Sequence, residues 1–198
     1  MMLIEQTGVP EGALPVAMMR DHLRLGSGFA DDAAQDGLVA AYLRAALAAV
    51  EGRIGKALLT RRFLLRLPDW RDAAGQALPV APVETVVSVA LVDAGGVAVA
   101  VDPGRWRLMR DMHRPRLMPV GALLPGVPQG GRVEVVFDAG FGAAWADVPA
   151  DLRQAVFLLA AQYHELRHEG GPGAAMPFGV MALIERWRTV RVLGGGGR

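Results

Sequence analysis

The sequence contains no cysteine and no asparagine, and its only serines are Ser27 and Ser88. The absence of cysteine excludes disulfides, thiolate nucleophiles and zinc sites that use sulfur ligands. Neither serine lies in a G-x-S-x-G elbow, so the sequence does not indicate a serine hydrolase. Thiol redox chemistry and the commonest nucleophilic mechanisms are therefore not predicted for this chain.

The sequence also lacks a long hydrophobic run. Its longest apolar runs, such as residues 155–161, fall far short of the roughly 20 residues that a helix needs to cross a bilayer. The first residues, MMLIEQTGVPEG, show no basic region followed by an apolar stretch. We therefore expect neither a membrane span nor a secretion signal.

Length and composition indicate a folded chain of about one domain. Of the 198 residues, 52% are hydrophobic and 21% are charged, which is enough apolar material for a packed core and too little charge for global disorder. The net charge is +1, with a mildly acidic first half and a mildly basic second half. This balance is not typical of a nucleic-acid-binding protein.

Hydrophobic periodicity predicts helices at both ends of the chain and strands between them. Apolar residues recur at steps of three and four near residues 16–24, 34–53, 149–168 and 178–188. From residue 60 to 138 the pattern is that of β-strands, with a hairpin turn at residues 93–96. We predict an α+β fold: a small helical bundle built from both chain ends (14–56 and 148–189) with a central antiparallel β subdomain (60–138).

The sequence predicts one domain over residues 1–190, followed by a flexible C-terminal arm at 191–198. Four consecutive glycines, residues 194–197, have the largest backbone entropy to lose on ordering. The alternating apolar residues before them, Val190, Val192 and Leu193, suit strand addition or docking into a groove.

One motif suggests an enzyme. His164-Glu165-Leu166-Arg167-His168 matches the zinc-protease pattern H-E-x-x-H on a predicted helix. A catalytic zinc needs a third protein ligand, however, and Ala174 occupies the position where metzincins carry a histidine. Glu185 could offer a carboxylate, but its spacing is short for such enzymes. We predict no metal, cofactor or catalytic residue, and keep a zinc metallohydrolase as the alternative.

A cluster of basic residues lies in the second half of the β region. The alternation in Arg105-Trp106-Arg107-Leu108 predicts that the two arginines share one face of a strand. Two interpretations stay open: a solvated strand face, or a surface that faces a partner protein or DNA phosphates. The residues of this candidate surface are Arg105, Arg107, Arg110, Arg114 and Arg116.

The order of short motifs along the chain is more specific than any one of them. It resembles the head-tail connector, or adaptor, family of long-tailed phages and gene transfer agents, over roughly residues 10–190. The motifs are HLRL (22–25), VEGRIGKAL (50–58), LPVAPV (78–83), VEVVFDAGFG (133–142), VPADLRQA (148–155) and PFGVMALI (177–184). The resemblance leaves open whether the particle is a phage or a gene transfer agent.

The resemblance implies a structural virion protein at the head-tail junction, assembled in the bacterial cytoplasm. Such a protein forms a ring, expected to be dodecameric, between the portal protein and the stopper or head-completion proteins of the tail. DNA passes through the ring with transient, non-specific contacts, and no membrane is involved. Because connectors of this family direct their C-terminal end toward the portal, the implied portal-contact residues are Val190, Arg191, Val192, Leu193 and Arg198.

Overall fold

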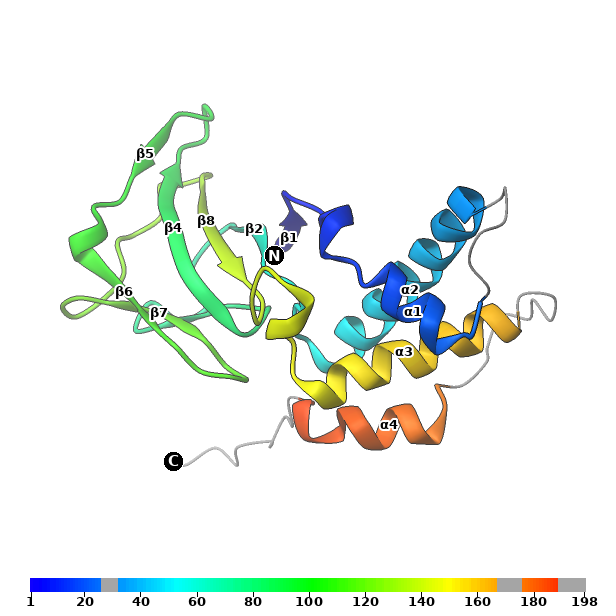
Figure 1. The fold of residues 1–198 in the computed structure, drawn as a ribbon. Coiled ribbons are helices and arrows are strands. Elements are labelled where there is room, and N and C mark those ends of the chain that lie inside the picture. The colour runs from blue at the N-terminus through cyan, green and yellow to red at the C-terminus, as the bar shows by residue number, and fades with distance from the viewer. Residues whose placement is uncertain (26–31, 167–175, 189–198) are drawn as a thin grey trace.

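The computed structural model describes residues 1–25, 32–166 and 176–188, and in them a helical part lies beside a β part (Figure 1). The α+β class predicted from the sequence is confirmed. The helices are α1 (Val16–His22), α2 (Asp32–Ile54), α3 (Ala150–Glu165) and α4 (Phe178–Ile184). No helix in these residues is long and apolar enough to span a membrane.

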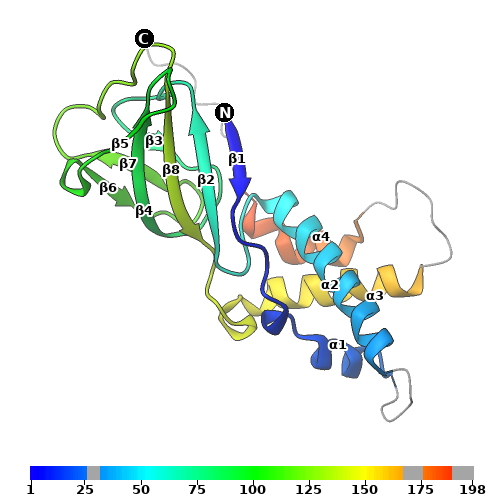
Figure 2. The same cartoon turned by 90° about the horizontal axis from the view of Figure 1, so that it is seen from above.

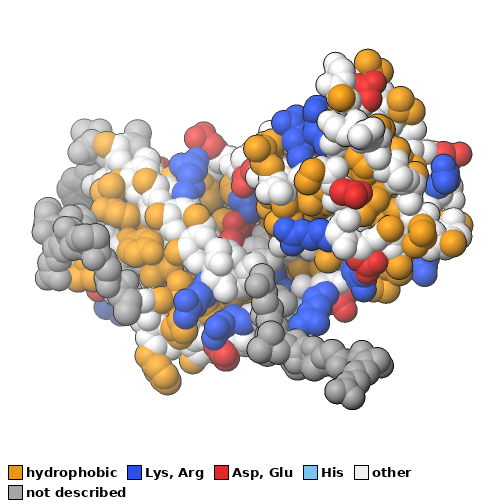
Figure 3. All heavy atoms as spheres, turned by 180° about the vertical axis from the view of Figure 1, so that it is seen from behind, with side chains coloured by type: hydrophobic (Ala, Val, Ile, Leu, Met, Phe, Trp, Pro, Cys, Tyr) orange, Lys and Arg blue, Asp and Glu red, His pale blue; other side chains and the backbone are white. Residues whose placement is uncertain are grey.

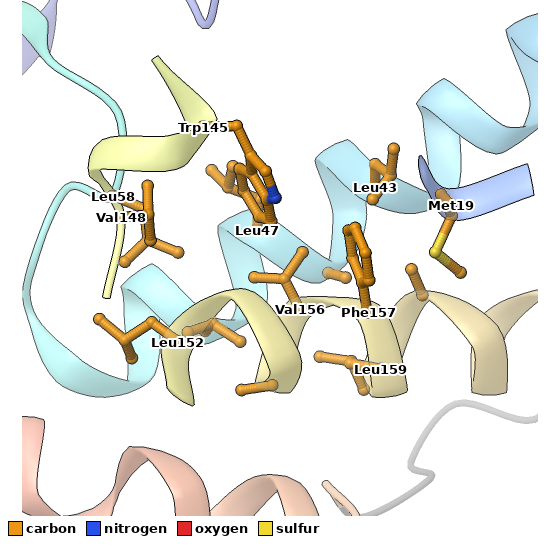
Figure 4. Packing of buried hydrophobic residues seen from close by; sticks show 14 of the residues in the cluster. Met19, Leu43, Leu47, Leu58, Trp145, Val148, Leu152, Val156, Phe157 and Leu159 are labelled. Carbon is orange, nitrogen blue, oxygen red and sulfur yellow. The ribbon is translucent and has the colours of Figure 1, made fainter. Parts of the chain in front are cut away.

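The helical part is held together by one hydrophobic core shared between the two ends of the chain. The apolar stripe of α2 packs on that of α3, α1 lies against α2, and α4 covers α3 (Figures 1 and 4). Trp145, from a short 3-10 turn (Trp145–Asp147), stacks on Phe157 with 5.6 Å between ring centroids. These contacts confirm the predicted packing of residues 39–54 against 152–187. The physical reason is that neither helix pair can bury its apolar face alone.

The β part contains a five-stranded antiparallel sheet in the order β1-β2-β8-β4-β5. Its strands are β1 (Met2–Glu5), β2 (Arg61–Leu67), β8 (Arg132–Ala139), β4 (Val83–Val92) and β5 (Ala98–Ala100). Strand β8 alternates buried and half-exposed residues along its length, as expected of a strand with one face on the core. The predicted hairpin turn joins β4 to β5, where Asp93 accepts hydrogen bonds from Val97 and Gly96.

A second, three-stranded sheet covers part of the first and closes the β core. Its order is β3-β7-β6, with β3 (Gln76–Ala77), β7 (Arg116–Pro119) and β6 (Trp106–Met109). Phe63 and Phe137 stack in the core between the sheets, 5.7 Å apart. Three 3-10 turns complete the described elements: Glu11–Ala13, Pro103–Arg105 and Glu185–Trp187.

Strand β1 and some helix ends differ from the prediction. The segment Met2–Glu5 pairs with β2 although about 60 residues separate them, and four residues carry too short a pattern to indicate such a partner. The third helix ends at Glu165 instead of residue 168, and the last changes to a 3-10 turn after Ile184. Helix ends are set by local capping and packing, which periodicity does not determine.

In the described residues the chain crosses between the two parts three times. Residues 6–15 lead from β1 to α1, and the other two crossings, residues 55–60 and 140–149, form a region that we call the junction. These two crossings bond to each other, because Thr60 N–H donates to Gly142 O at 2.8 Å and Phe141 N–H to Leu58 O at 3.2 Å. A buried ion pair adds to them: Arg61 Nη2 lies 2.6 Å from Glu51 Oε2, with both side chains almost fully enclosed. The junction therefore ties the end of α2 to the start of β2.

Candidate partner interface

Arg105, the last residue of the 3-10 turn before β6, and Arg107, within β6, lie where the alternation predicts. Arg105 and Arg107 are exposed, whereas Trp106 and Leu108 are half-buried and pack against the β core. A period of two places successive side chains on opposite faces of a strand. These two arginines therefore form an exposed basic strip on the outer face of the second sheet.

The other arginines of the predicted cluster do not join that strip. Arg110 reaches back to β4 and donates to Glu84 O at 2.9 Å. Arg116 pairs with Asp72, with 2.7 Å between Nη2 and Oδ2, and also donates to Gly75 O. Arg110 and Arg116 therefore brace neighbouring segments, and the structure divides the cluster among several surfaces.

Arg114 and Arg116 instead line a surface groove beside the end of α2, with a volume of about 920 Å³. Its walls come from residues 52–55, 71–79 and 113–116, with Met1 and the end of the described chain. We call it the arginine groove, after Arg53, Arg71, Arg114, Arg116 and Arg188. The face in Figure 3 shows blue basic side chains on both sides of the boundary between the two parts.

The electrostatics of the arginine groove favour an anionic partner. Asp72 is the single acidic residue among the described lining residues and is paired with Arg116, while Arg188 is paired with Glu185 beside the groove. Guanidinium groups bind carboxylates and phosphates through paired, charge-assisted hydrogen bonds. The groove can therefore receive an acidic protein segment or a phosphate-bearing ligand.

Lys56, the single lysine of the chain, supports the wall of the arginine groove from inside. Its side chain is only 2% exposed, Nζ donates to Met112 O, and it lies 3.2 Å from His113 Nδ1. Burial lowers the pKa of Lys56, and the Asp111 carboxylate offsets part of this fall. The lysine thus anchors the loop that presents His113 and Arg114 to the groove.

The same loop is also closed by a carboxylate. Asp111 Oδ1 accepts the backbone N–H groups of His113 at 2.7 Å and Arg114 at 2.6 Å. These two hydrogen bonds hold the pKa of Asp111 below its usual value. Loop and lysine together fix the position of one wall of the arginine groove.

Sequence reasoning did not find the arginine groove or Lys56. The groove arginines lie at positions 53, 71, 114, 116 and 188, so no window of the sequence contains most of them. The only available signal for Lys56 was its uniqueness in a chain whose other basic residues are arginines. Arginine stays charged in proteins, whereas lysine tolerates burial by a shift in its pKa.

The residues of the zinc motif do not form a metal site in the described part of the chain. His164 packs edge-on against Tyr42, with ring centroids 5.9 Å apart, and Glu185 pairs with Arg188 at 2.9 Å. His168 and Ala174 lie outside the described residues. Across residues 1–25, 32–166 and 176–188, no group of three or more histidine, aspartate or glutamate side chains could hold a metal ion.

The predicted portal-contact residues also lie outside the described residues. They are Val190, Arg191, Val192, Leu193 and Arg198. The described chain ends at Arg188, which lines the arginine groove.

The described residues contain two packed cores and a basic groove at the surface. Comparison with family models and with curated proteins gives no match. Comparison with solved structures, in contrast, gives matches over nearly the whole chain.

Three of these structures are components of gene transfer agent (GTA) particles. A chain from the neck of an empty GTA particle, computed with C6 symmetry, is 63% identical with a TM-score of 0.90. A chain from the virion of a native GTA particle is 64% identical (TM-score 0.87), and one from the neck of a native particle, computed with C12 symmetry, is 60% identical (TM-score 0.85). Each match covers 98% of this chain and 99% of the other.

The chain belongs to the family of GTA neck proteins, which are structural components of the virion. It is not an enzyme, so the zinc-hydrolase alternative does not describe its function. The expectation of a structural virion protein is confirmed at this level.

Proposed function

We propose that this chain is the ring adaptor of a GTA neck, placed between the portal and the stopper or tail proteins. The observation that carries the proposal is 60–63% identity over nearly the full length with chains from GTA necks computed with C6 and C12 symmetry. Rotational symmetry of this kind requires each copy to contact the next through two different surfaces. We propose a ring of twelve copies.

The charge of the chain suits a conduit for DNA. A net charge of +1 gives little non-specific attraction for phosphates, whereas a strongly basic wall would bind and retard the passing DNA. We therefore propose that contacts with DNA are transient. The arginine groove, where the basic residues converge, instead binds an acidic segment of a neighbouring neck protein.

Charge reversal in the arginine groove tests its role. Arg53→Glu combined with Arg114→Glu should reduce incorporation of the protein into necks at least tenfold, because two guanidinium partners of the acidic segment become repulsive. Particle-bound protein is measured by quantitative blotting of purified particles. The matched control is Arg105→Glu with Arg107→Glu, the same change of charge on the exposed strip of β6, which should leave incorporation unchanged. The opposite pattern would place the interface on β6.

The C-terminal arm is the proposed portal contact. Removing residues 190–198 should leave the thermal unfolding midpoint almost unchanged, because the core residues found in the described part of the chain all precede them. It should nevertheless abolish co-sedimentation with purified portal rings, and electron microscopy of the full-length mixture should show added ring density on the portal. Wild-type binding by the truncated chain would show that the portal contact lies elsewhere, and absence of ring density with the full-length chain would contradict the adaptor function.

A further inference from the structure

The two outer strands of the five-stranded sheet, β1 and β5, carry exposed apolar side chains. They lie at opposite edges, as Figure 2 shows, and in the described residues each pairs with one strand only. The exposed fractions are 56% for Met2 and 64% for Val99 within the strands, and 59% for Met1 and 62% for Val97 immediately before them. A free edge with such side chains is a template for pairing with another chain.

Neither edge has the features that protect free edges in soluble proteins. Lysine, proline and outward charges usually block pairing at such strands. Strand β5 contains only alanine and valine, and Glu5, the one charged residue of β1, pairs with Arg61 at 3.3 Å. Both edges are therefore chemically open to a further strand.

The hydrogen bonds within the sheet identify which residues of the two edge strands have backbone N–H and C=O groups that point away from the sheet. Asp93 N–H donates to Val97 O and Val101 N–H donates to Val89 O, so Ala98 and Ala100 direct their own N–H and C=O groups away from β4. On the other edge, Gln6 N–H donates to Arg62 O. By the same alternation, Leu3 and Glu5 direct their backbone groups away from β2.

Strand direction decides how two copies can pair. Every neighbouring pair of strands from β1 to β5 is antiparallel, so the first and last strands of the order β1-β2-β8-β4-β5 run in the same direction. We take the axis of the proposed ring to run along the strands, and a rotation about such an axis leaves this direction unchanged. The edge β5 of one copy therefore meets β1 of the next copy in parallel, with the same sheet face continuing across the contact.

We propose that β5 of each copy pairs in parallel with β1 of the next copy, so that the sheets join around the ring. The inference rests on the proposed ring. Val97 lies opposite Met1 of the next copy and Val99 opposite Leu3, both on the face that carries the β core. In a parallel ladder, a residue whose N–H and C=O point to the other strand bonds to the two residues on either side of the one opposite it. In this register, Ala98 bonds to Met1 and Leu3 of the next copy, and Ala100 bonds to Leu3 and Glu5.

The contact between β5 and β1 of the next copy buries little surface, so we expect it to form only during assembly of the neck. A stable interface buries about 1,200–2,000 Å², more than two short strands supply. The edge pairing should therefore form in the assembled neck, where portal and tail contacts hold neighbouring copies together, and be weak in the isolated protein.

A disulfide trap tests the pairing, because the wild-type chain has no cysteine. In assembled particles carrying Leu3→Cys with Val99→Cys, mild oxidation should give a ladder of cross-linked oligomers on a non-reducing gel. A bond within one copy is impossible, because four strand spacings of about 4.8 Å separate the edges and a disulfide spans about 7 Å between Cα atoms at most. Intact particles without cross-links would overturn the pairing while the ring itself stands.

Matched variants exclude other contacts. In Leu3→Cys with Val87→Cys, the second thiol lies on β4, at a residue that is exposed to solvent but belongs to an interior strand of the sheet. This variant should give no ladder of cross-linked oligomers. Val99→Cys alone should give no dimer, and a strong dimer would instead indicate β5 pairing with β5 across a two-fold axis. Absence of rings in wild-type necks by electron microscopy would overturn the proposed adaptor, and with it this contact.

Discussion

Glu51→Ala should lower the free energy of unfolding by about 3–5 kcal/mol, because it leaves a buried guanidinium without its main partner. Arg61 is only 7% exposed in its side chain, and Glu51 Oε2 lies 2.6 Å from its Nη2. The other carboxylate oxygen of Glu51 accepts Leu58 N–H at 2.6 Å, so the variant also frees a backbone donor at the junction. Urea denaturation followed by circular dichroism measures the change.

An exposed ion pair of the same sheet supplies the control. Arg62 holds Asp138 through two hydrogen bonds, but 45% of its side chain is exposed and solvent screens the attraction. Asp138→Ala should therefore change the denaturation midpoint far less than Glu51→Ala. Equal effects would show that burial does not set the importance of the Glu51–Arg61 pair.

The titration of Glu51 gives this prediction a pH dependence. Burial raises the pKa of Glu51, and the Arg61 charge and the Leu58 N–H offset part of the rise. Between the ordinary and the raised pKa, the folded chain binds more protons than the unfolded chain, so the contribution of Glu51 to stability falls as the pH rises through this window. The difference in free energy of unfolding between wild type and Glu51→Gln should therefore decrease as the pH rises from the ordinary to the raised pKa of Glu51. Above the raised pKa this difference should stay constant.

Gly140→Ala should also destabilise the protein strongly, by roughly 2–6 kcal/mol, the combined cost of a strained backbone and an overpacked site. Gly140 has a φ of +151°, and an added Cβ would lie 2.4 Å from both Cα and N of Thr60. The neighbouring atoms are backbone atoms of the other crossing at the junction, so no side chain can move aside. Thermal unfolding and soluble yield measure the effect.

Gly37→Ala is the matched control with the opposite sign. Gly37 lies inside α2, and an added Cβ would meet no atom within 4 Å. Alanine in a helix interior is favoured over glycine by roughly 0.5–1 kcal/mol, so this variant should unfold at a slightly higher temperature than wild type. A large loss at Gly37 as well would show that the effect at Gly140 is not specific to the junction.

The sequence alone determined the elements whose signal is local. The apolar residues of α2 at positions 39, 43, 47, 50 and 54 recur at helical spacing, and all five are buried. The turn at residues 93–96 and the alternation in β6 were predictable for the same reason. In each case the residues that specify the structure are neighbours in the chain, so propensity and periodicity report on them directly.

The order of motifs along the chain also carried information about function. It indicated a head-tail connector of the virion, and the identity to chains of GTA necks confirms the coarser class, a structural virion protein. It did not identify the surfaces of contact. The predicted arginine cluster proved to be several separate surfaces, because Arg110 and Arg116 bond to distant segments while Arg105 and Arg107 stay on the strand face.

Only the tertiary structure decided the features made by residues far apart in the sequence. The pairing of β1 with β2 joins Met2 to Arg66, the junction joins Glu51 to Arg61, and the burial of Lys56 depends on the loop at Met112. The arginine groove collects its arginines from four separate segments of the chain. Such contacts form only when the packing of both cores brings the segments together, and no local pattern of residues predicts which distant segments will meet.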